Sequence, residues 1–418
     1  MVQSIRAARV DSLKLGRLLF CVLVMLFCEK KICCLDVNLL IATRNSKVSA
    51  YSEINKGEIC LVFAQLACCI PGNEYEEINR VLAAAFPNNP LKGEILQIFQ
   101  EQHSSAVDID PAKPSIVLFN EMFFGRDKAL TRASVDSVVD CYRSFLPFFR
   151  GVYLYIDFLY SDVMKDCYRS QVEASMRRYQ QIDVEERNND LFRGFSSIWF
   201  GGTYGPPNYN PDGMNSWYLT QVLNGVDFPL FRRMLLFNQI KVFLDGNEVG
   251  YFNKSSFCGE SLKSFIDRTS VRENVPFYVI GDFEMHWTGS YNTLLDNVTN
   301  LICYDTDAIS NLSTQQQPCK KDLCLFISNT YDTLPESIND RKMRHGVFDK
   351  VYACADPKGR VIGVVDGSVK GFMTGVFTTT DGSLFPLTGI SQASAFVYQF
   401  PRREVMNEYK ISVFKLGK

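Results

Sequence analysis

Residues 115–156, SIVLFNEMFFGRDKALTRASVDSVVDCYRSFLPFFRGVYLYI, decide the class of the fold. The stretch opens with the apolar run Ser115–Phe119 and closes with the apolar run Val152–Ile156, both of strand length. Between them, Ser134–Phe149 has the pattern of a helical segment. Continuous apolar strands are typical of sheets that are buried on both faces by helices. The stretch therefore predicts an α/β unit, with Glu121 just past the end of its first strand.

The same alternation continues on both sides of this unit. Upstream, Ile59–Leu66 (ICLVFAQL) is interpreted as a buried strand and Glu74–Phe86 as an amphipathic helix, so the first third reads β-α-β-α-β. Downstream, Met234–Leu244 and Glu248–Ser256 flank Asp245-Gly246-Asn247, and the Asp-Gly pair favours a tight hairpin turn. Further strands are predicted at Phe277–Ile280, Val298–Cys303, Leu323–Ser328, Val351–Cys354 and Arg360–Val365, and a helix at Glu336–Gly346.

Composition limits the classes of partner. A chain of 418 residues with 46% apolar content can bury one large core or two moderate ones. Its 44 Lys and Arg are offset by 46 Asp and Glu, for a formal net charge of −2. Without an excess of positive charge, neither nucleic acid nor an anionic lipid surface is an expected partner.

The first 35 residues have the layout of a signal peptide or a short N-terminal membrane anchor. Basic residues precede the apolar run Leu18–Cys28 (LLFCVLVMLFC), and Glu29, Lys30 and Lys31 close it. As a helix this run would span about half of a ~30 Å hydrocarbon core. No clean small-x-small cleavage site follows, so an uncleaved anchor and a buried N-terminal helix stay as alternatives. We therefore expect the protein to be exported, and to be secreted, periplasmic or attached to a membrane through its N-terminus.

The cysteines do not indicate a metal site. Four of the 14 lie in or beside the leader, and some of the ten in the body can pair after export. Cys319 and Cys324 (CKKDLC) lack a second ligand pair, and the chain has only three histidines. Neither a metal nor another cofactor is therefore expected.

Three segments carry the candidate chemistry: PSIVLFNEMFFG with Glu121, DGNEVGYFNKSSFCGES with Lys254, and VTNLICYDTD with Cys303. Taken singly, each also fits a structural role, as a solvated strand end, an exposed hairpin lysine or an inert buried cysteine. Together and in this order they resemble the nitrilase superfamily of carbon–nitrogen hydrolases. The strand end Ile-Cys-Tyr-Asp is the strongest part of that resemblance.

The resemblance runs from about Ile59 to Gly367 and implies a four-layer α-β-β-α sandwich of the nitrilase type. Gln65, at the end of the first predicted strand, and Glu260, in Phe-Cys-Gly-Glu, also fit the family. The expected hydrolase domain covers residues 57–400, with an insertion at about 201–230. The loop at 201–213 would account for the long spacing from Glu121 to Lys254, and Ser261–Asn274 for part of the spacing from Lys254 to Cys303. Residues 401–418 would form a C-terminal tail or strand. Family members associate through helical surfaces, which implies a homodimer.

The resemblance also implies a mechanism for a small-molecule amide or nitrile substrate. Cys303 would be the nucleophile and form a thioester, because a thiolate attacks an acyl carbon far better than a thiol. Lys254 would stabilise the thiolate and then the oxyanion. Glu121 would carry protons as base, acid and base again. Glu260 would orient Lys254 or a substrate proton.

Three alternatives to this hydrolase remain. A Cys-His hydrolase would use His286 and no lysine, although no Asn or Asp is signalled to orient the imidazole. An N-acyltransferase of the same superfamily would use the same three residues. A catalytically inactive binding module would explain the long insertions and Thr306-Asp307-Ala308, where the family usually has Arg-Phe-Pro. Tyr304 and Asp305 are expected to be structural parts of the nucleophile turn.

Overall fold

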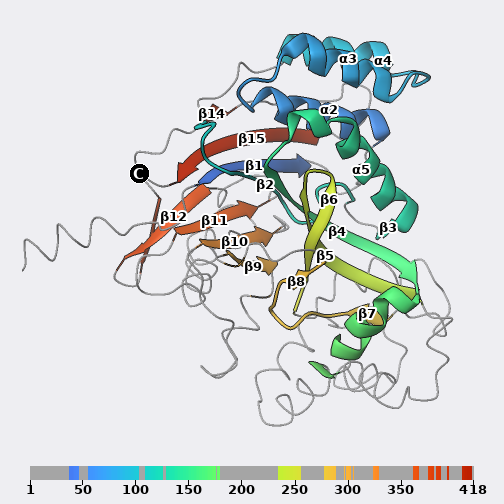
Figure 1. Cartoon of the computed structure of the whole chain (residues 1–418), viewed down its shortest axis with the longest axis vertical. Coiled ribbons are helices and arrows are strands. Elements are labelled where there is room, and N and C mark those ends of the chain that lie inside the picture. Colours follow the sequence, from blue (N-terminus) through green and yellow to red (C-terminus); the bar gives the residue numbers. More distant parts are fainter. Residues whose placement is uncertain are drawn as a thin grey trace, which may run out of the picture.

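The structure is a computed structural model. It describes residues 37–46, 55–102, 109–125, 129–175, 177–178, 234–255, 277–288, 296, 298–302, 305, 323–328, 361–366, 375–380, 383–386, 393–394 and 407–416. In this part of the chain the strands form two sheets, and helices cover one face of the larger sheet (Figure 1).

The larger sheet has the strand order β14-β15-β1-β2-β4-β5-β6-β8, with β3 beside β4 and β7 beside β5. Its strands are β1 (Val37–Ser46), β2 (Ser115–Phe119), β3 (Leu130–Thr131), β4 (Val152–Val163), β5 (Met234–Leu244), β6 (Asn247–Asn253), β7 (Phe277–Val279), β8 (His286–Trp287), β14 (Ala393–Ser394) and β15 (Asn407–Leu416). β1, β2 and β4 run parallel, whereas β4, β5 and β6 are antiparallel. β5 and β6 form the predicted hairpin.

The smaller sheet has the strand order β13-β12-β11-β10-β9. Its strands are β9 (Val298–Ile302), β10 (Leu323–Ser328), β11 (Val361–Asp366), β12 (Gly375–Thr380) and β13 (Ser383–Pro386). β9, β10 and β11 are parallel, and β12 and β13 continue antiparallel.

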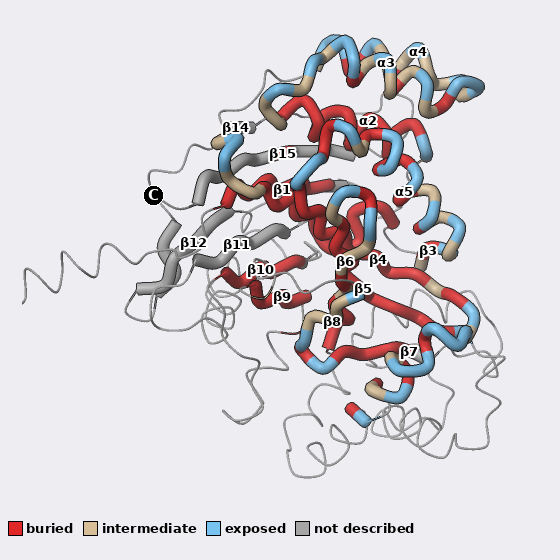
Figure 2. Tube along the Cα trace, in the orientation of Figure 1, coloured by how far each residue is buried: buried red, intermediate tan, exposed pale blue. Residues whose placement is uncertain are grey.

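The helical layer consists of α2 (Lys56–Cys68), α3 (Tyr75–Ala85), α4 (Lys92–Gln102) and α5 (Arg132–Ser144), with the short 3-10 turns η2 (Leu146–Phe148) and η3 (Asp166–Tyr168). α3 and α4 are outermost, and their outward faces are exposed in Figure 2, whereas α2 is buried. No helix within the described ranges is both long and apolar enough to cross a membrane.

Alternate side chains of β1, β2 and β4 point to opposite faces of the larger sheet and so lie in two separate cores. In β1, Leu40 and Ala42 pack with the helices, whereas Leu39 and Ile41 lie in a second cluster with the smaller sheet. β2 and β4 alternate in the same way. The smaller sheet contributes Val298, Ile302, Leu323, Leu325 and Ile327 to that second cluster. The described residues therefore form a helical layer and two facing sheets.

Most of the predicted elements are confirmed where the structure describes them. β2 and β10 have the predicted limits, the predicted helix at Glu74–Phe86 corresponds to α3, and the predicted strand Val152–Ile156 continues to Val163. The expected insertion at about 201–230, the helix at Glu336–Gly346 and the strand at Val351–Cys354 lie outside the described residues.

The prediction of a strand at Ile59–Leu66 is wrong, because these residues lie in α2. The helix begins with a capping box: Asn55 Oδ1 accepts the Glu58 N–H at 3.0 Å, and Glu58 Oε2 accepts the Asn55 N–H at 3.0 Å. Every residue from Gly57 to Cys68 is buried, between the sheet and the other helices. A helix buried on all sides shows no amphipathic period, so its apolar run reads like that of a buried strand.

Two strands of the larger sheet lie outside the expected limits of 57–400. β1 precedes them and β15 follows them, and the two pair antiparallel along ten residues each. Residues 401–418, expected to be a tail or strand, thus include β15, which lies between β14 and β1. Gln65, assigned to the end of a first strand, is a buried residue of α2.

Candidate active site

Glu121 lies in the turn that follows β2. Asn120 Oδ1 accepts the backbone N–H of Arg44, in β1, at 2.8 Å, and Asn120 Nδ2 donates to the Glu121 carbonyl at 3.0 Å. The Arg44 guanidinium donates to the carbonyl of Phe123 at 2.9 Å. Met122 has a φ of 55°, in the left-handed region that a side chain of this size rarely adopts. The turn is thus tied to β1 and holds a constrained backbone.

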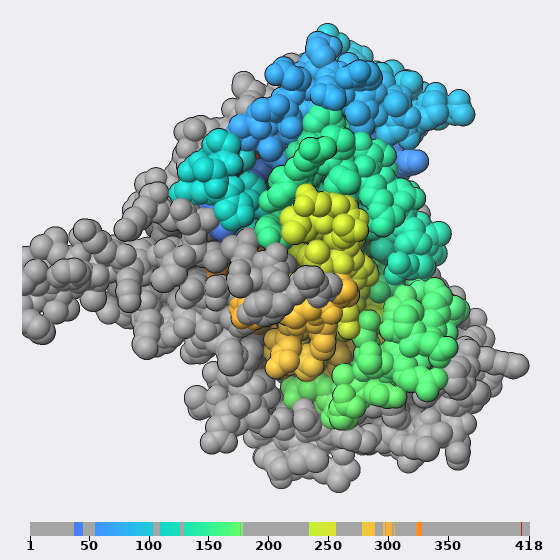
Figure 3. All heavy atoms as spheres, viewed as in Figure 1, coloured from blue at the N-terminus to red at the C-terminus, as the bar shows by residue number. Residues whose placement is uncertain are grey.

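Lys254 follows the last residue of β6 and is held by its backbone. Its N–H donates to the Asn238 carbonyl in β5 at 2.8 Å, and its carbonyl accepts the Gly281 N–H at 2.9 Å. A Cβ at Gly281 would collide with the Asn253 carbonyl, so this close approach requires glycine. Ser255 Oγ accepts the Phe283 N–H at 2.9 Å. Figure 3 shows part of the β5–β6 hairpin (yellow) at the surface beside the orange segment that includes β8.

Glu121 and Lys254 form a buried ion pair. Lys254 Nζ donates to Glu121 Oε1 at 2.9 Å, and the two side chains are 1% and 3% exposed, respectively. Asn238 Nδ2 donates to the same oxygen at 3.0 Å. An ion pair loses its hydration on burial, and mutual attraction repays that cost only with good geometry and further hydrogen bonds. The bond from Asn238 is one such further hydrogen bond.

Asp305 links this pair to the end of β9. Its Oδ1 accepts the Ser255 N–H at 2.8 Å, and its Oδ2 accepts the Ile302 N–H at 3.0 Å. One buried carboxylate thus joins the residue after Lys254 to the last residue of β9. In the sequence, Cys303 lies between Ile302 and Asp305.

The structure brings together two of the four predicted catalytic residues. Glu121 and Lys254 are in contact, although they are 133 positions apart. Cys303 and Glu260 lie outside the described residues, as does Tyr304. The positions of the predicted nucleophile and second glutamate thus stay predictions.

Asp157, on β4, bonds to the turn that carries Glu121 and was not among the residues predicted from the sequence. It is fully buried, and its Oδ2 accepts the Met122 N–H at 2.8 Å. Burial, together with the nearby charge of Glu121, raises the pKa of this carboxyl well above its usual value. The available signal was a single acid within the apolar run YLYIDFLY. Asn238, within MLLFNQI, gave the same kind of signal.

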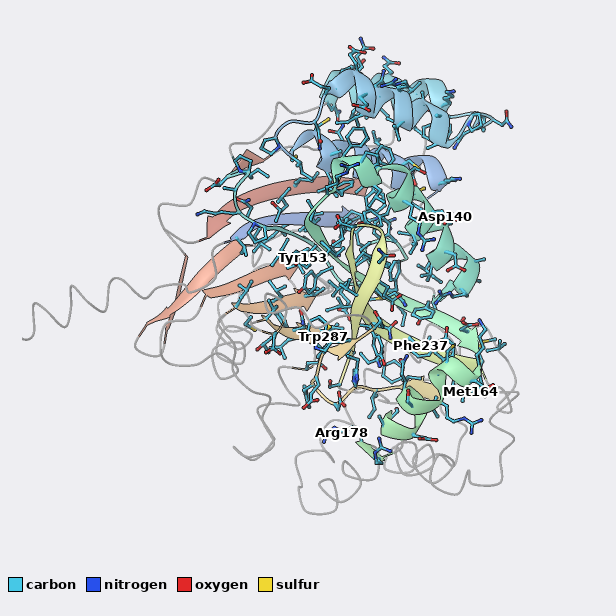
Figure 4. All side chains as sticks on the ribbon, viewed as in Figure 1. Asp140, Tyr153, Met164, Arg178, Phe237 and Trp287 are labelled. Carbon is cyan, nitrogen blue, oxygen red and sulfur yellow. The ribbon has the colours of Figure 1, made fainter. Side chains whose placement is uncertain are left out.

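His286, in β8, lies away from the Glu121–Lys254 pair, because its side chain is on the opposite face of the larger sheet. Its ring stacks on Tyr251 at 5.1 Å between centroids, whereas the next residue, Phe252, belongs to the core between the sheets. In Figure 4, Trp287 of β8 and Tyr153 of β4 are labelled, and both belong to or pack against that core. An aspartate, Asp282, lies 3.0 Å from His286 Nε2, a partner that sequence analysis did not detect, and it raises the pKa of the imidazole.

Comparison with known proteins gives a distant likeness. Neither a family model nor a curated protein matches the sequence. The chain is similar to the glutamine-dependent NAD+ synthetase from Acinetobacter baumannii in complex with adenosine diphosphate, with 10% identity and a TM-score of 0.37 over 91% of this chain and 48% of that one. The chain is also similar to the glutamine-dependent NAD(+) synthetase from Cytophaga hutchinsonii, with 9% identity and a TM-score of 0.34 over 90% of this chain and 43% of that one. The chain therefore spans less than half the length of these proteins, and likeness at this level carries no argument about activity.

Proposed function

We propose that this chain is a cysteine-dependent hydrolase of non-peptide carbon–nitrogen bonds, of the nitrilase kind. The observation that supports it most is the buried contact of 2.9 Å between Lys254 Nζ and Glu121 Oε1. These residues were selected by their place in a nitrilase-like order, and contact between them is what a shared site requires. The tie from Ser255 through Asp305 to Ile302 supports the inclusion of Cys303 in that site.

The proposed reaction uses three groups in turn. The Cys303 sulfur attacks the acyl carbon while its proton passes to Glu121, and Lys254 stabilises the developing oxyanion. Glu121 then returns the proton to the leaving amine as the carbon–nitrogen bond breaks, which leaves a thioester. Finally, Glu121 takes a proton from water, which attacks the thioester. The carbon–sulfur bond breaks, the acid is released, and the proton passes from Glu121 to the Cys303 sulfur. Glu260 would be a second carboxylate that orients Lys254.

The finer parts of the proposal concern the fold, the substrate and the cell compartment. We expect the two facing sheets to belong to a four-layer α-β-β-α sandwich, in a domain that associates as a homodimer. The substrate would be a small amide or nitrile. Residues 1–35 would direct export or membrane attachment.

The reactivity of the thiols tests the assignment of the nucleophile. At pH 7, iodoacetamide should label one thiol much faster than the others, and Cys303→Ser should abolish that label together with turnover of small amides. Cys167 is the exposed thiol among the described cysteines, so Cys167→Ser is the matched control and should leave fast labelling intact. No fast-labelling thiol and no turnover would favour the inactive binding module.

Replacement of Glu121 tests the proton carrier. Glu121→Gln keeps the shape of the side chain but cannot exchange protons, so the thioester formed from an activated ester should persist and appear in the mass spectrum. Lys254→Ala should instead lower the rate of acylation by about 10² to 10³, as expected for loss of an oxyanion donor. If Glu121→Gln deacylates as fast as the wild type, the role of Glu121 is wrong. Faster deacylation by an added primary amine, with amide as the product, would indicate the N-acyltransferase.

A further inference from the structure

Asp157 has one hydrogen-bonded carboxyl oxygen and one that is not. Oδ2 accepts the Met122 N–H, whereas Oδ1 is buried and has no hydrogen-bond partner among the described residues. Asp157 is on the face of β4 that also carries Tyr153 and Tyr155, which is the face toward the smaller sheet. The carboxyl therefore lies in the core between the sheets, on the side that contains the Glu121–Lys254 pair.

The bond to Met122 fixes the peptide that follows Glu121. Asn120 Nδ2 holds the carbonyl of this peptide, and Asp157 Oδ2 holds its N–H. Met122 is in the left-handed region, a conformation that costs roughly 1–2 kcal/mol for a residue other than glycine. The turn that aims Glu121 at Lys254 thus depends on an external acceptor for the Met122 N–H.

The charges around Asp157 favour its neutral form. Three charged groups influence the pKa of its carboxyl: Glu121, which follows β2, Lys254, which follows β6, and Asp305, which follows β9. Lys254 contacts Glu121, and Asp305 accepts two backbone N–H groups. Among the described residues, Asp157 has one backbone donor and a buried Oδ1 with no partner, which is a poor environment for a second negative charge.

We propose that Asp157 is a positioning residue that stays protonated in the folded protein and holds the Met122 amide so that Glu121 is fixed against Lys254. The part of this proposal that concerns turnover rests on the proposed hydrolase function. The part that concerns the proton and the turn does not.

Stability as a function of pH tests whether Asp157 keeps its proton. An unfolded aspartate titrates near pH 4. Above this pH and below the folded pKa, the native protein binds a proton that the unfolded chain lacks, so the folding constant decreases about tenfold per pH unit. Asp157→Asn lacks this contribution. We expect the ratio of the wild-type to the Asp157→Asn folding constant, from urea unfolding, to fall as pH rises above 4. A ratio that is flat or rises with pH would overturn the proposal.

Kinetics of paired variants test positioning. Asp157→Asn keeps an acceptor for the Met122 N–H and should leave kcat within about threefold, whereas Asp157→Ala should lower kcat by about 10- to 100-fold with KM unchanged, as a small misplacement of a catalytic group does. Tyr155→Phe, which removes another buried polar atom from the same face of β4, is the matched control and should leave kcat unchanged. Equal kcat in Asp157→Ala and Asp157→Asn would overturn the positioning role. Absence of turnover in the wild type would contradict the hydrolase function but leave the stability test valid.

Discussion

At the scale of single residues, the candidate site contains a buried pair of opposite charges. Glu121 and Lys254 are almost fully buried, and Asn238 adds a second hydrogen bond to the same carboxylate oxygen. Two apolar side chains of similar size would fill this space with less loss of hydration. The pair therefore adds little stability over apolar side chains, which agrees with the chemical role proposed for it.

Glu121 and Lys254 should be coupled energetically in a double-mutant cycle. Lys254→Met and Glu121→Gln should each destabilise the fold by about 3 kcal/mol, because each leaves a buried charge without its partner. The double variant should lose less than the sum of the two. Urea unfolding at pH 7 measures these differences. Arg132→Met, which breaks the exposed pair with Asp136 at 3.0 Å, is the control and should cost well under about 1 kcal/mol. Additive losses would contradict the coupling.

At the scale of elements, α2 is the centre of the helical layer, and its contact with α5 brings two thiols together. The sulfur atoms of Cys60 and Cys141 are 2.7 Å apart, and both residues are completely buried. The neighbouring Cys141 thiol and burial raise the pKa of Cys60, so its thiol is a poor nucleophile once the helices have packed. Any oxidation of this pair should thus take place during folding.

We predict that Cys60 and Cys141 form a disulfide when the unfolded chain refolds with glutathione disulfide as oxidant. Two thiols lose their protons and two electrons, and glutathione disulfide is reduced to two thiols. A bridge over 81 positions should stabilise the fold by about 4.5 kcal/mol on the loop-entropy estimate. Peptide mapping without reductant detects the linked peptides. Cys68→Ser should keep the bridge and Cys60→Ser should lose it, while its absence from oxidised wild type would refute the prediction.

At the scale of the whole molecule, β1 and β15 join the two ends of the described chain. β15 pairs with β1 from Val37 opposite Leu416 to Ser46 opposite Asn407. β1 is in turn parallel to β2, the strand that leads to Glu121. The last strand thus supports the first half of the site from the far end of the sequence.

We predict that a chain ending at residue 406 does not fold to a stable protein. The truncation leaves the backbone groups of β1 unpaired along one edge and removes Ile411 from the helical core. The loss should exceed the roughly 5–15 kcal/mol by which domains are stable. Thermal unfolding of the soluble fraction measures this effect, with removal of residues 417–418 alone as the control. A 406-residue chain that melts within a few degrees of the full chain would show that β15 is dispensable.

Elements whose sequence pattern is local could be predicted from the sequence. The apolar runs of β2 and β10 were assigned with their observed limits, and the Asp-Gly turn predicted the hairpin of β5 and β6. α2 was assigned to the wrong class because a helix buried on every side has no polar face to reveal its period. Its capping box at Asn55 and Glu58 was the local signal that distinguishes it from a strand.

The sequence by itself determined the alternation of strands and helices, the hairpin before Lys254, and the place of Glu121 just past a buried strand. Only the tertiary structure decided that Glu121 meets Lys254, that Asp157 accepts the N–H that follows Glu121, and that β15 pairs with β1. The physical reason is the range of the interactions. Turn preferences and apolar runs act between residues near in sequence, whereas these contacts join segments that come together only when the sheet forms and excludes water.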